Sequence, residues 1–232
     1  MSRRWKHILL GSVLGVLGLG VVVVWLLGYE PPYYRQALEA DPGQQSQASQ
    51  QMVAQALQLT NQVKYDPHWE ALFTQEQING YLAVELPQNH PEMLPPEVKQ
   101  PRVWITSQGV YVFFRYRTGA LNTVIHILVD AYVTEDHQVA LHLRQVRAGM
   151  VPLPMSEVVE LISQQASRLD VSLRWAQKDG RPVALIQIPP LRGNRRVVVD
   201  SIQLERGQVL IRGRTLESQS VSELWPQGSN RQ

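Results

Sequence analysis

The most reactive side chains in this sequence are two histidines and an aspartate that lie close together along the chain. His126 and Asp130 fall on one face of an expected strand, and a hairpin register that pairs apolar residues places His142 opposite Asp130. Histidine and carboxylate groups bind zinc, but a zinc site needs a third or fourth ligand and a dry surrounding shell. A cross-strand His–Asp pair on a half-exposed face is therefore the simpler interpretation.

Common catalytic and cofactor-binding motifs are missing from the sequence. The chain has no GxSxG elbow, no HExxH pair and no glycine loop of the kind that binds phosphate. It also contains no cysteine, which excludes thiol nucleophiles, disulfides and lipoprotein acylation. We therefore expect a non-catalytic protein without a cofactor or a metal ion.

A basic cluster lies between two expected hairpins and consists of Arg192, Arg195 and Arg196. Basic loops are attracted to anionic lipid headgroups, so this cluster is one candidate for membrane contact. A solvated turn is the alternative interpretation.

Two apolar features of the sequence favour a binding function over catalysis. Residues 110–116, VYVFFRY, are apolar on both faces of an expected strand, and residues 149–154, GMVPLP, form an unusually apolar loop. A sheet with one face in water alternates between apolar and polar residues, and a solvated loop is rich in Asn, Asp and Ser. Either helices cover both faces of the sheet and the loop closes the end of a packed core, or one face lines a groove and the loop forms its rim.

We predict that a lipid acyl chain or another hydrophobic ligand binds in such a groove. Its lining would come from the sheet and from the apolar loop, with these residues: Phe113, Leu128, Tyr132, Met150, Val151 and Leu153. An enclosed apolar cavity would favour a lipid-like ligand. A flat apolar patch or an unpaired edge strand would instead favour assembly with another envelope protein.

The first part of the chain predicts a membrane anchor. Residues 8–28 carry no charge, and a helix of this length is about 30 Å long, enough to cross a bilayer. Arg3, Arg4 and Lys6 precede this segment, which predicts a cytoplasmic N-terminus and an extracytoplasmic remainder in the cell envelope. A cleaved signal peptide is the rival interpretation, but it usually has a shorter apolar region and a small-x-small cleavage site.

Net charge excludes one class of partner. The chain carries +2 in total and its three basic residues before position 8 supply +3, so residues 29–232 carry −1. Nucleic-acid binding depends on neutralising phosphates, so we expect no nucleic-acid partner.

The clearest local signal is a helix start within FTQEQINGYL, residues 73–82. Thr74 and Gln77 have the spacing of a capping box, and Phe73 and Ile78 occupy the hydrophobic-staple positions. This helix should bury Ile78, Tyr81 and Leu82 and end before Pro87. A second helix is expected from a narrow apolar stripe over residues 48–63, and a third follows Ser156 as N-cap.

Four hairpins follow from requiring apolar residues to face apolar residues. Their expected turns are at 108–109, 135–137, 179–180 and 206–207. The first hairpin should pair Ile105 with Val112 and Trp104 with Phe113, and the second should pair Val133 with Val139. The third should pair Trp175 with Ala184 and Val171 with Ile188, and the fourth Leu204 with Val209.

The expected fold class is α+β. An N-terminal transmembrane helix is followed by a long antiparallel β-meander of about four hairpins, packed with two or three helices. The expected divisions are a cytoplasmic stub (1–7), a transmembrane helix (8–28), a spacer (29–43), an extracytoplasmic domain (44–216) and a flexible tail (217–232).

Two short motifs, together with the anchor, resemble the YpmS-like family of membrane-anchored envelope proteins. Phe73, Asn79 and Leu82 match its first helix, and Gly149, Pro152 and Pro154 match the loop before its later helix. The resemblance implies an anchored α+β envelope protein. It assigns no activity and no functional residue, because the family has none assigned. The architecture is also similar to tubular lipid-binding domains, an analogy that concerns the fold alone.

Overall fold

The computed structural model describes residues 22, 25–119, 121–189, 191 and 195–217. This part of the chain is an α+β protein with antiparallel sheets and five α-helices, which confirms the predicted fold class at that level. Among these residues no helix combines the length and the apolar character needed to cross a membrane. The predicted span, residues 8–28, lies outside the described residues except for positions 22 and 25–28.

The helices and strands follow one another in mixed order along the chain. The helices are α2 (Pro32–Leu38), α3 (Pro42–Tyr65), α4 (Gln75–Ala83), α5 (Glu85–Asn89), the 3-10 helix η1 (Pro91–Met93) and α6 (Met155–Arg168). The strands are β1 (His68–Thr74), β2 (Val98–Thr106), β3 (Gly109–Thr118), β4 (Leu121–Val133), β5 (Val139–Ala148), β6 (Val151–Pro152), β7 (Leu173–Lys178), β8 (Arg181–Ile186), β9 (Arg195–Glu205) and β10 (Gln208–Glu217).

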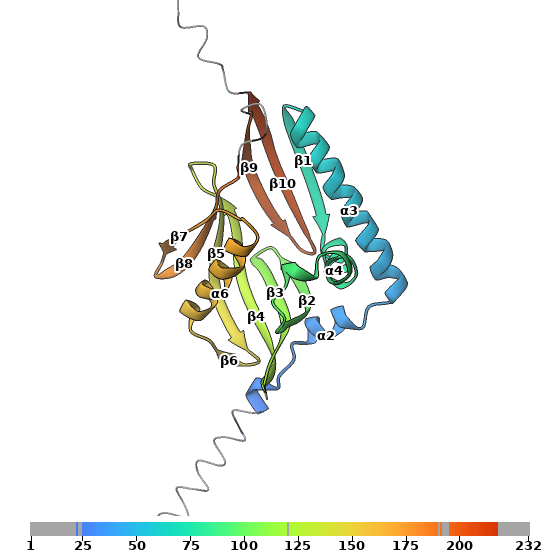
Figure 1. Ribbon diagram of the computed structural model, residues 1–232, viewed down its shortest axis with the longest axis vertical. Helices are drawn as coiled ribbons and strands as arrows, with labels where there is room; N and C mark the ends of the chain where they lie inside the picture. Colours follow the sequence, from blue (N-terminus) through green and yellow to red (C-terminus); the bar gives the residue numbers. More distant parts are fainter. Residues whose placement is uncertain (1–21, 23–24, 120, 190, 192–194, 218–232) are drawn as a thin grey trace, which may run out of the picture.

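The strands form two sheets, so the prediction of one continuous meander is wrong. The larger sheet has the order β2-β3-β4-β5-β8-β7, with β6 paired to β5, and the smaller has the order β1-β10-β9. Figure 1 shows α3 running along the smaller sheet and α6 lying against the larger one. Strand β1 was not predicted from the sequence. Its buried residues are Trp69, Ala71 and Phe73, and it pairs with β10 of the last hairpin in a separate sheet.

Three of the four predicted hairpin registers are confirmed within their ladders. The pairs Val133–Val139, Trp175–Ala184 and Leu204–Val209 all occur. Asp179 and Gly180 both have positive φ, 52° and 71°, as a type I′ turn requires. The outermost predicted pair of the third hairpin, Val171 with Ile188, lies beyond the ends of β7 and β8.

The register predicted for the first hairpin is wrong by two residues. Ile105 pairs with Val110 and Trp104 pairs with Tyr111, because the turn comprises residues 107–108 and the closing pair is Thr106–Gly109. A shift of two residues keeps every side chain on its own face, so matching apolar faces does not detect it. The Thr106 hydroxyl donates to the Gly109 carbonyl and stabilises the observed turn.

Helix starts agree with the sequence in one case and differ in another. The capping box at Thr74 is confirmed, since its hydroxyl accepts from the Gln77 N–H and the Gln77 side chain accepts from the Thr74 N–H. The prediction of Ser156 as N-cap is wrong. Helix α6 begins at Met155, and Pro154, with a non-helical ψ of 128°, occupies the N-cap position without a side-chain hydrogen bond.

Helices cover both faces of the larger sheet, which explains the two-sided apolarity of residues 110–116. On one face Val158 of α6 packs on a buried cluster of Ile125, Ile127, Leu143, Val146 and Ala148. On the other face Tyr34 of α2 is fully buried against Phe113 and Val124. Leu153 joins the first cluster, so this part of the apolar loop packs into the core.

The segment expected to be a spacer, residues 29–43, is part of the folded body. The Tyr34 hydroxyl donates to the Gln100 carbonyl at 3.1 Å, and Arg102 donates to the Ala37 carbonyl at 3.3 Å. Arg102 is buried, and burial lowers the pKa of its guanidinium from the usual range. The chain therefore passes from residue 25 onto the sheet without a free polar linker.

Candidate binding edge of the seven-stranded sheet

The predicted His–Asp pair exists, but His126 stands apart from it. His142 lies opposite Asp130, with 3.9 Å between its Nδ1 and the carboxylate, and Arg144 approaches the same carboxylate at 3.4 Å. His126 pairs with Arg147 beyond a register shift, and burial together with Arg147 lowers the His126 pKa. Within the described ranges no three His, Cys, Asp or Glu residues are grouped to hold a metal ion.

The six residues predicted to bind a hydrophobic ligand are not brought together. Phe113 and Leu128 are buried on the face that carries Tyr34, whereas Leu153 packs on the opposite face. Tyr132 lies under the Lys178 ammonium, Val151 pairs with Ala148, and Met150 is exposed. None of the six lines any of four open clefts, of about 260 to 610 Å³, in the described part of the chain.

The predicted basic cluster is only partly visible. Arg192 lies outside the described residues. Arg195 donates to the Lys64 carbonyl, and Arg196 is exposed. Whether the three arginines form one basic surface therefore stays a prediction.

One outer strand of the seven-stranded sheet, β2, is covered by side chains. The peptide groups of Val103 and Ile105 point away from β3, because the two-residue turn makes Thr106–Gly109 a hydrogen-bonded pair and such pairs alternate. Asn79 accepts from the Val103 N–H at 2.7 Å and donates to its carbonyl at 2.9 Å. Gln75 accepts from the Ile105 N–H at 2.8 Å, and the Gly207 N–H donates to the Ile105 carbonyl at 3.0 Å.

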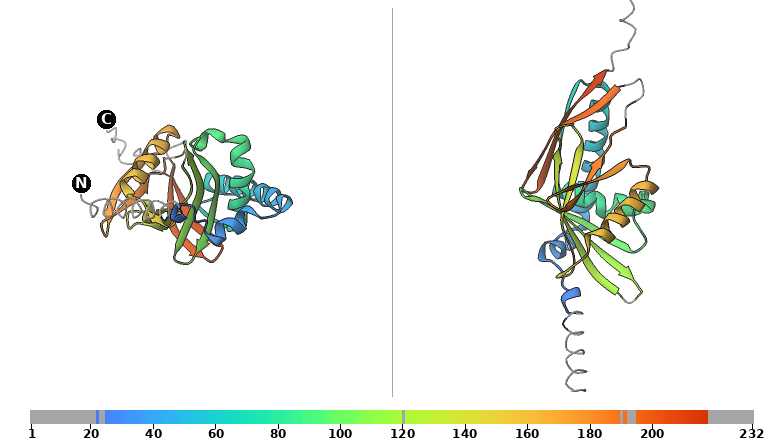
Figure 2. Two further views of the ribbon diagram at one scale, coloured as in Figure 1. Left: turned by 90° about the horizontal axis from the view of Figure 1, so that it is seen from below. Right: turned by 90° about the vertical axis from the view of Figure 1, so that its left-hand side faces the viewer.

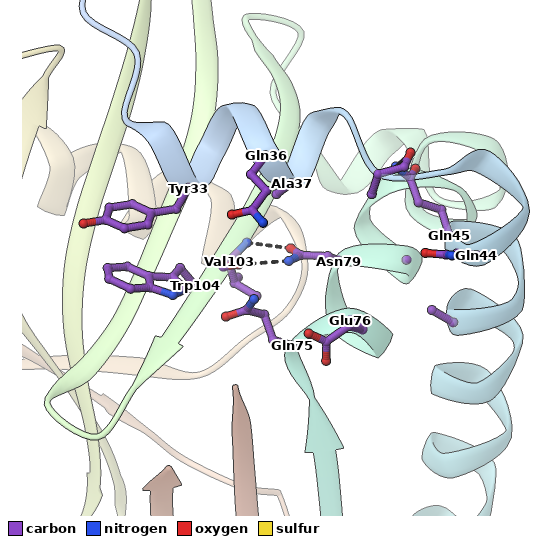
Figure 3. A pocket seen from close by; sticks show the side chains of 13 residues that line it. Tyr33, Gln36, Ala37, Gln44, Gln45, Gln75, Glu76, Asn79, Val103 and Trp104 are labelled. Carbon is purple, nitrogen blue, oxygen red and sulfur yellow. Dashed lines mark hydrogen bonds between the residues drawn. The ribbon is translucent and has the colours of Figure 1, made fainter. Parts of the chain in front are cut away.

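Helix α4 is held in place to make these contacts. Its capping box sets the direction of the first turn, and Gly80 lets its backbone approach α3 closely. A Cβ at position 80 would lie 2.7 Å from the Gln45 carbonyl oxygen and the Ser49 nitrogen. Figure 3 shows the two hydrogen bonds between Asn79 and Val103 on one wall of a cleft of about 260 Å³. At its mouth Tyr33 stacks on Trp104 with 3.8 Å between the ring centroids.

The other outer strand, β7, has no such cover. The turn at Asp179–Gly180 makes Lys178–Arg181 the closing hydrogen-bonded pair, and the bond from the Gln187 N–H to the Ser172 carbonyl fits the same alternation. The peptide groups of Leu173, Trp175 and Gln177 therefore point away from β8. Within the part of the chain that the structure describes, these six backbone groups have no hydrogen-bond partner.

The two faces beside β7 differ in character. On the α6 side the Trp175 indole donates to the Ser163 hydroxyl at 2.8 Å, and an open cleft of about 470 Å³ is lined by Val159, Trp175 and Pro182 with three other residues. On the opposite side Arg174 contacts Gln138, and the Lys178 ammonium lies 4.6 Å from the centre of the Tyr132 ring. The edge thus has an apolar side and a basic side.

Compared with known protein families, curated proteins and solved structures, the chain matches none. The β7 edge was not predicted from the sequence, although the Asp179–Gly180 turn determines which peptide groups of residues 173–178 point outward.

Proposed function

We propose that this protein is a membrane-anchored, extracytoplasmic, non-catalytic scaffold that holds a partner polypeptide along the edge strand β7. The observation that carries the proposal is the row of outward peptide groups at Leu173, Trp175 and Gln177. An extended peptide can pair with all three residues by adding a strand to the sheet. The kinship with YpmS-like envelope proteins remains a prediction from the motifs.

The surroundings of β7 define the chemistry of the partner. A strand added beside β7 would point alternate side chains to opposite faces of the sheet. On one face they would meet the apolar cleft of Val159, Trp175 and Pro182, and on the other the cations Arg174 and Lys178. The proposed partner is therefore a segment in which apolar residues alternate with acidic ones.

The basic side chains are not arranged to block strand addition. Charged residues on an edge strand often prevent unwanted pairing between sheets. Here Lys178 lies over Tyr132 and Arg174 extends to Gln138, so both side chains run across the face of the sheet. The backbone of β7 stays accessible at its outer side.

A peptide-binding experiment tests the scaffold function. The probe is a synthetic peptide in which valine alternates with glutamate, added to the full-length protein in detergent micelles. We expect slower amide hydrogen exchange at Leu173, Trp175 and Gln177 when the peptide binds, because their N–H groups become paired. Unchanged exchange at all three positions would overturn the proposal.

A pair of variants at Gln177 makes the test specific. Gln177→Pro removes one outward N–H and leaves the ladder with β8 intact, whereas Gln177→Ala keeps that N–H. The proline variant should lose peptide binding and the alanine variant should keep it. Equal binding by both would show that the peptide does not add as a strand.

The anchor and its orientation belong to the same proposal. The support is the uncharged segment 8–28 with Arg3, Arg4 and Lys6 before it. Protease added to spheroplasts should digest the domain while leaving the cytoplasmic stub protected. Protection of the domain would contradict the proposed orientation.

Acyl-chain binding remains a second proposal. Met150 is exposed and its N–H donates to the carbonyl of Leu26, at the end of the predicted span, so a bilayer lipid would be close to it. Native mass spectrometry of the full-length protein released from micelles tests this directly. Lipid adducts that disappear in the Val151→Asp variant would support it, and a clean protein mass would argue against it.

A further inference from the structure

Three separate segments meet at one end of the molecule. The Met150 N–H donates to the Leu26 carbonyl at 2.9 Å, and the buried Thr123 hydroxyl donates to the Leu27 carbonyl at 2.6 Å. Gly149, with φ of 55°, lies so close to Leu26 that an added Cβ would be 2.2 Å from its carbonyl oxygen. Figures 1 and 2 show residues 25–28 and the adjoining ends of β3 and β4 at the same end of the long axis.

This end of the molecule exposes large apolar and aromatic side chains. The exposed fractions are 72% for Trp25, 42% for Tyr29, 39% for Leu121 and 43% for Met150. We call these four residues the basal surface. Tryptophan and tyrosine are the residues enriched where membrane proteins cross the headgroup region, because their rings are apolar with one polar group.

The charge around the basal surface is positive. The segments that form this end, residues 25–31, 115–124 and 147–153, contain three arginines and one glutamate, which gives a net charge of +2. The glutamate, Glu30, is paired with Arg115. Arg117 and Arg147 are both exposed, and exposed arginines are attracted to lipid phosphates.

We propose that the basal surface rests in the headgroup region of the bilayer, with Leu121 and Met150 reaching the acyl boundary. This inference rests on the proposed membrane anchor and concerns a different surface from β7. The occupant is the bilayer, because the uncharged residues 8–24 lead directly into Trp25. A peripheral surface that combines aromatic, apolar and basic residues binds a lipid interface through all three.

The contacts between the anchor end and the sheet give this surface a fixed orientation. The carbonyls of Leu26 and Leu27 are bonded to the domain, Glu30 pairs with Arg115, and Tyr34 is fully buried. Residues 26–34 therefore act as a rigid connection. The domain stands on the membrane instead of moving on a flexible tether.

Nitroxide depth measurements test the proposal in full-length protein. The chain has no native cysteine, so single cysteines at positions 121 and 150 can be labelled selectively. The probe membrane is a nanodisc of mixed phosphatidylcholine and phosphatidylglycerol. For each label, the measured quantity is its collision rate with dissolved oxygen divided by its collision rate with a water-soluble nickel complex. We expect this ratio to be several-fold higher at positions 121 and 150 than at control sites. Matched controls are Leu72 and Leu161, which are also exposed leucines but lie on β1 and α6.

A label at Trp25 separates failure of this proposal from failure of the anchor. If Trp25 reports lipid while positions 121 and 150 behave like Leu72, the anchor holds and the basal surface is overturned. If Trp25 also reports water, the proposed anchor fails together with the basal surface. Lipid-like values at 25, 121 and 150 support both.

Discussion

The outer strands β2 and β7 belong to the same sheet but differ in whether their outward backbone groups are hydrogen-bonded. At β2, the four outward groups of Val103 and Ile105 are bonded to Asn79, Gln75 and Gly207. At β7, six outward groups have no partner within the described residues. An open edge is a hazard for aggregation and also a template for binding. The contrast shows that this fold can cover an outer strand, and the proposed scaffold function assigns the uncovered strand β7 to a partner.

The largest effect is expected from uncovering β2. Asn79→Ala removes two hydrogen bonds and leaves the partly buried Val103 N–H and carbonyl unpaired, which should cost about 2–3 kcal/mol of unfolding free energy. Asn89→Ala is the matched control, since the Asn89 side chain makes only a solvent-exposed hydrogen bond, to the Glu85 carboxylate. Urea unfolding measures both. Similar losses in the two variants would mean that Asn79 does not stabilise the edge.

The next largest effect is expected from disturbing the packing of α4, the helix that covers β2, against α3. Gly80→Ala places a methyl group 2.7 Å from backbone atoms of α3, so the helices must separate, and we expect a cost of about 1–2 kcal/mol. Gly43→Ala adds the same group where only the Asp41 side chain is near, and serves as control. Thermal unfolding of the two variants decides the point. A Gly80→Ala protein as stable as the control would contradict close packing of α4 on α3.

A smaller effect is expected from the cap that orients α4. Thr74→Ala removes the acceptor for the Gln77 N–H and should cost about 1 kcal/mol. Thr74→Ser retains a hydroxyl and should recover most of that loss. The two variants can be compared by denaturant midpoint. Equal destabilisation by serine and alanine would show that the methyl group, not the cap, matters.

The smallest effect is expected at the open edge. Gln177→Pro should lie within about 0.5 kcal/mol of Gln177→Ala, because the lost N–H points away from β8. Ala176→Pro, one residue away, removes a ladder N–H and should cost distinctly more. Unfolding of the three variants is compared directly. Equal cost for the two prolines would reverse the orientation inferred for β7.

The apolar pattern of the sequence predicted which residues are buried, but not which element covers them. Phe113 and Leu128 were expected to line a groove because strand 110–116 is apolar on both faces. In the structure Tyr34 covers Phe113, and it comes from a segment that looked like a spacer. A two-residue slip in the first hairpin escaped detection for a related reason, since it preserves both faces.

Local features were determined by the sequence itself, because they depend on backbone dihedrals and hydrogen bonds within a few residues. The capping box at Thr74, the Asp179–Gly180 turn and the loop at 135–137 are of this kind. Only the tertiary structure decided which strand stands beside which. The β7–β8 hairpin has the same internal register whichever strand faces β5, and packing placed β8 inside and β7 at the edge.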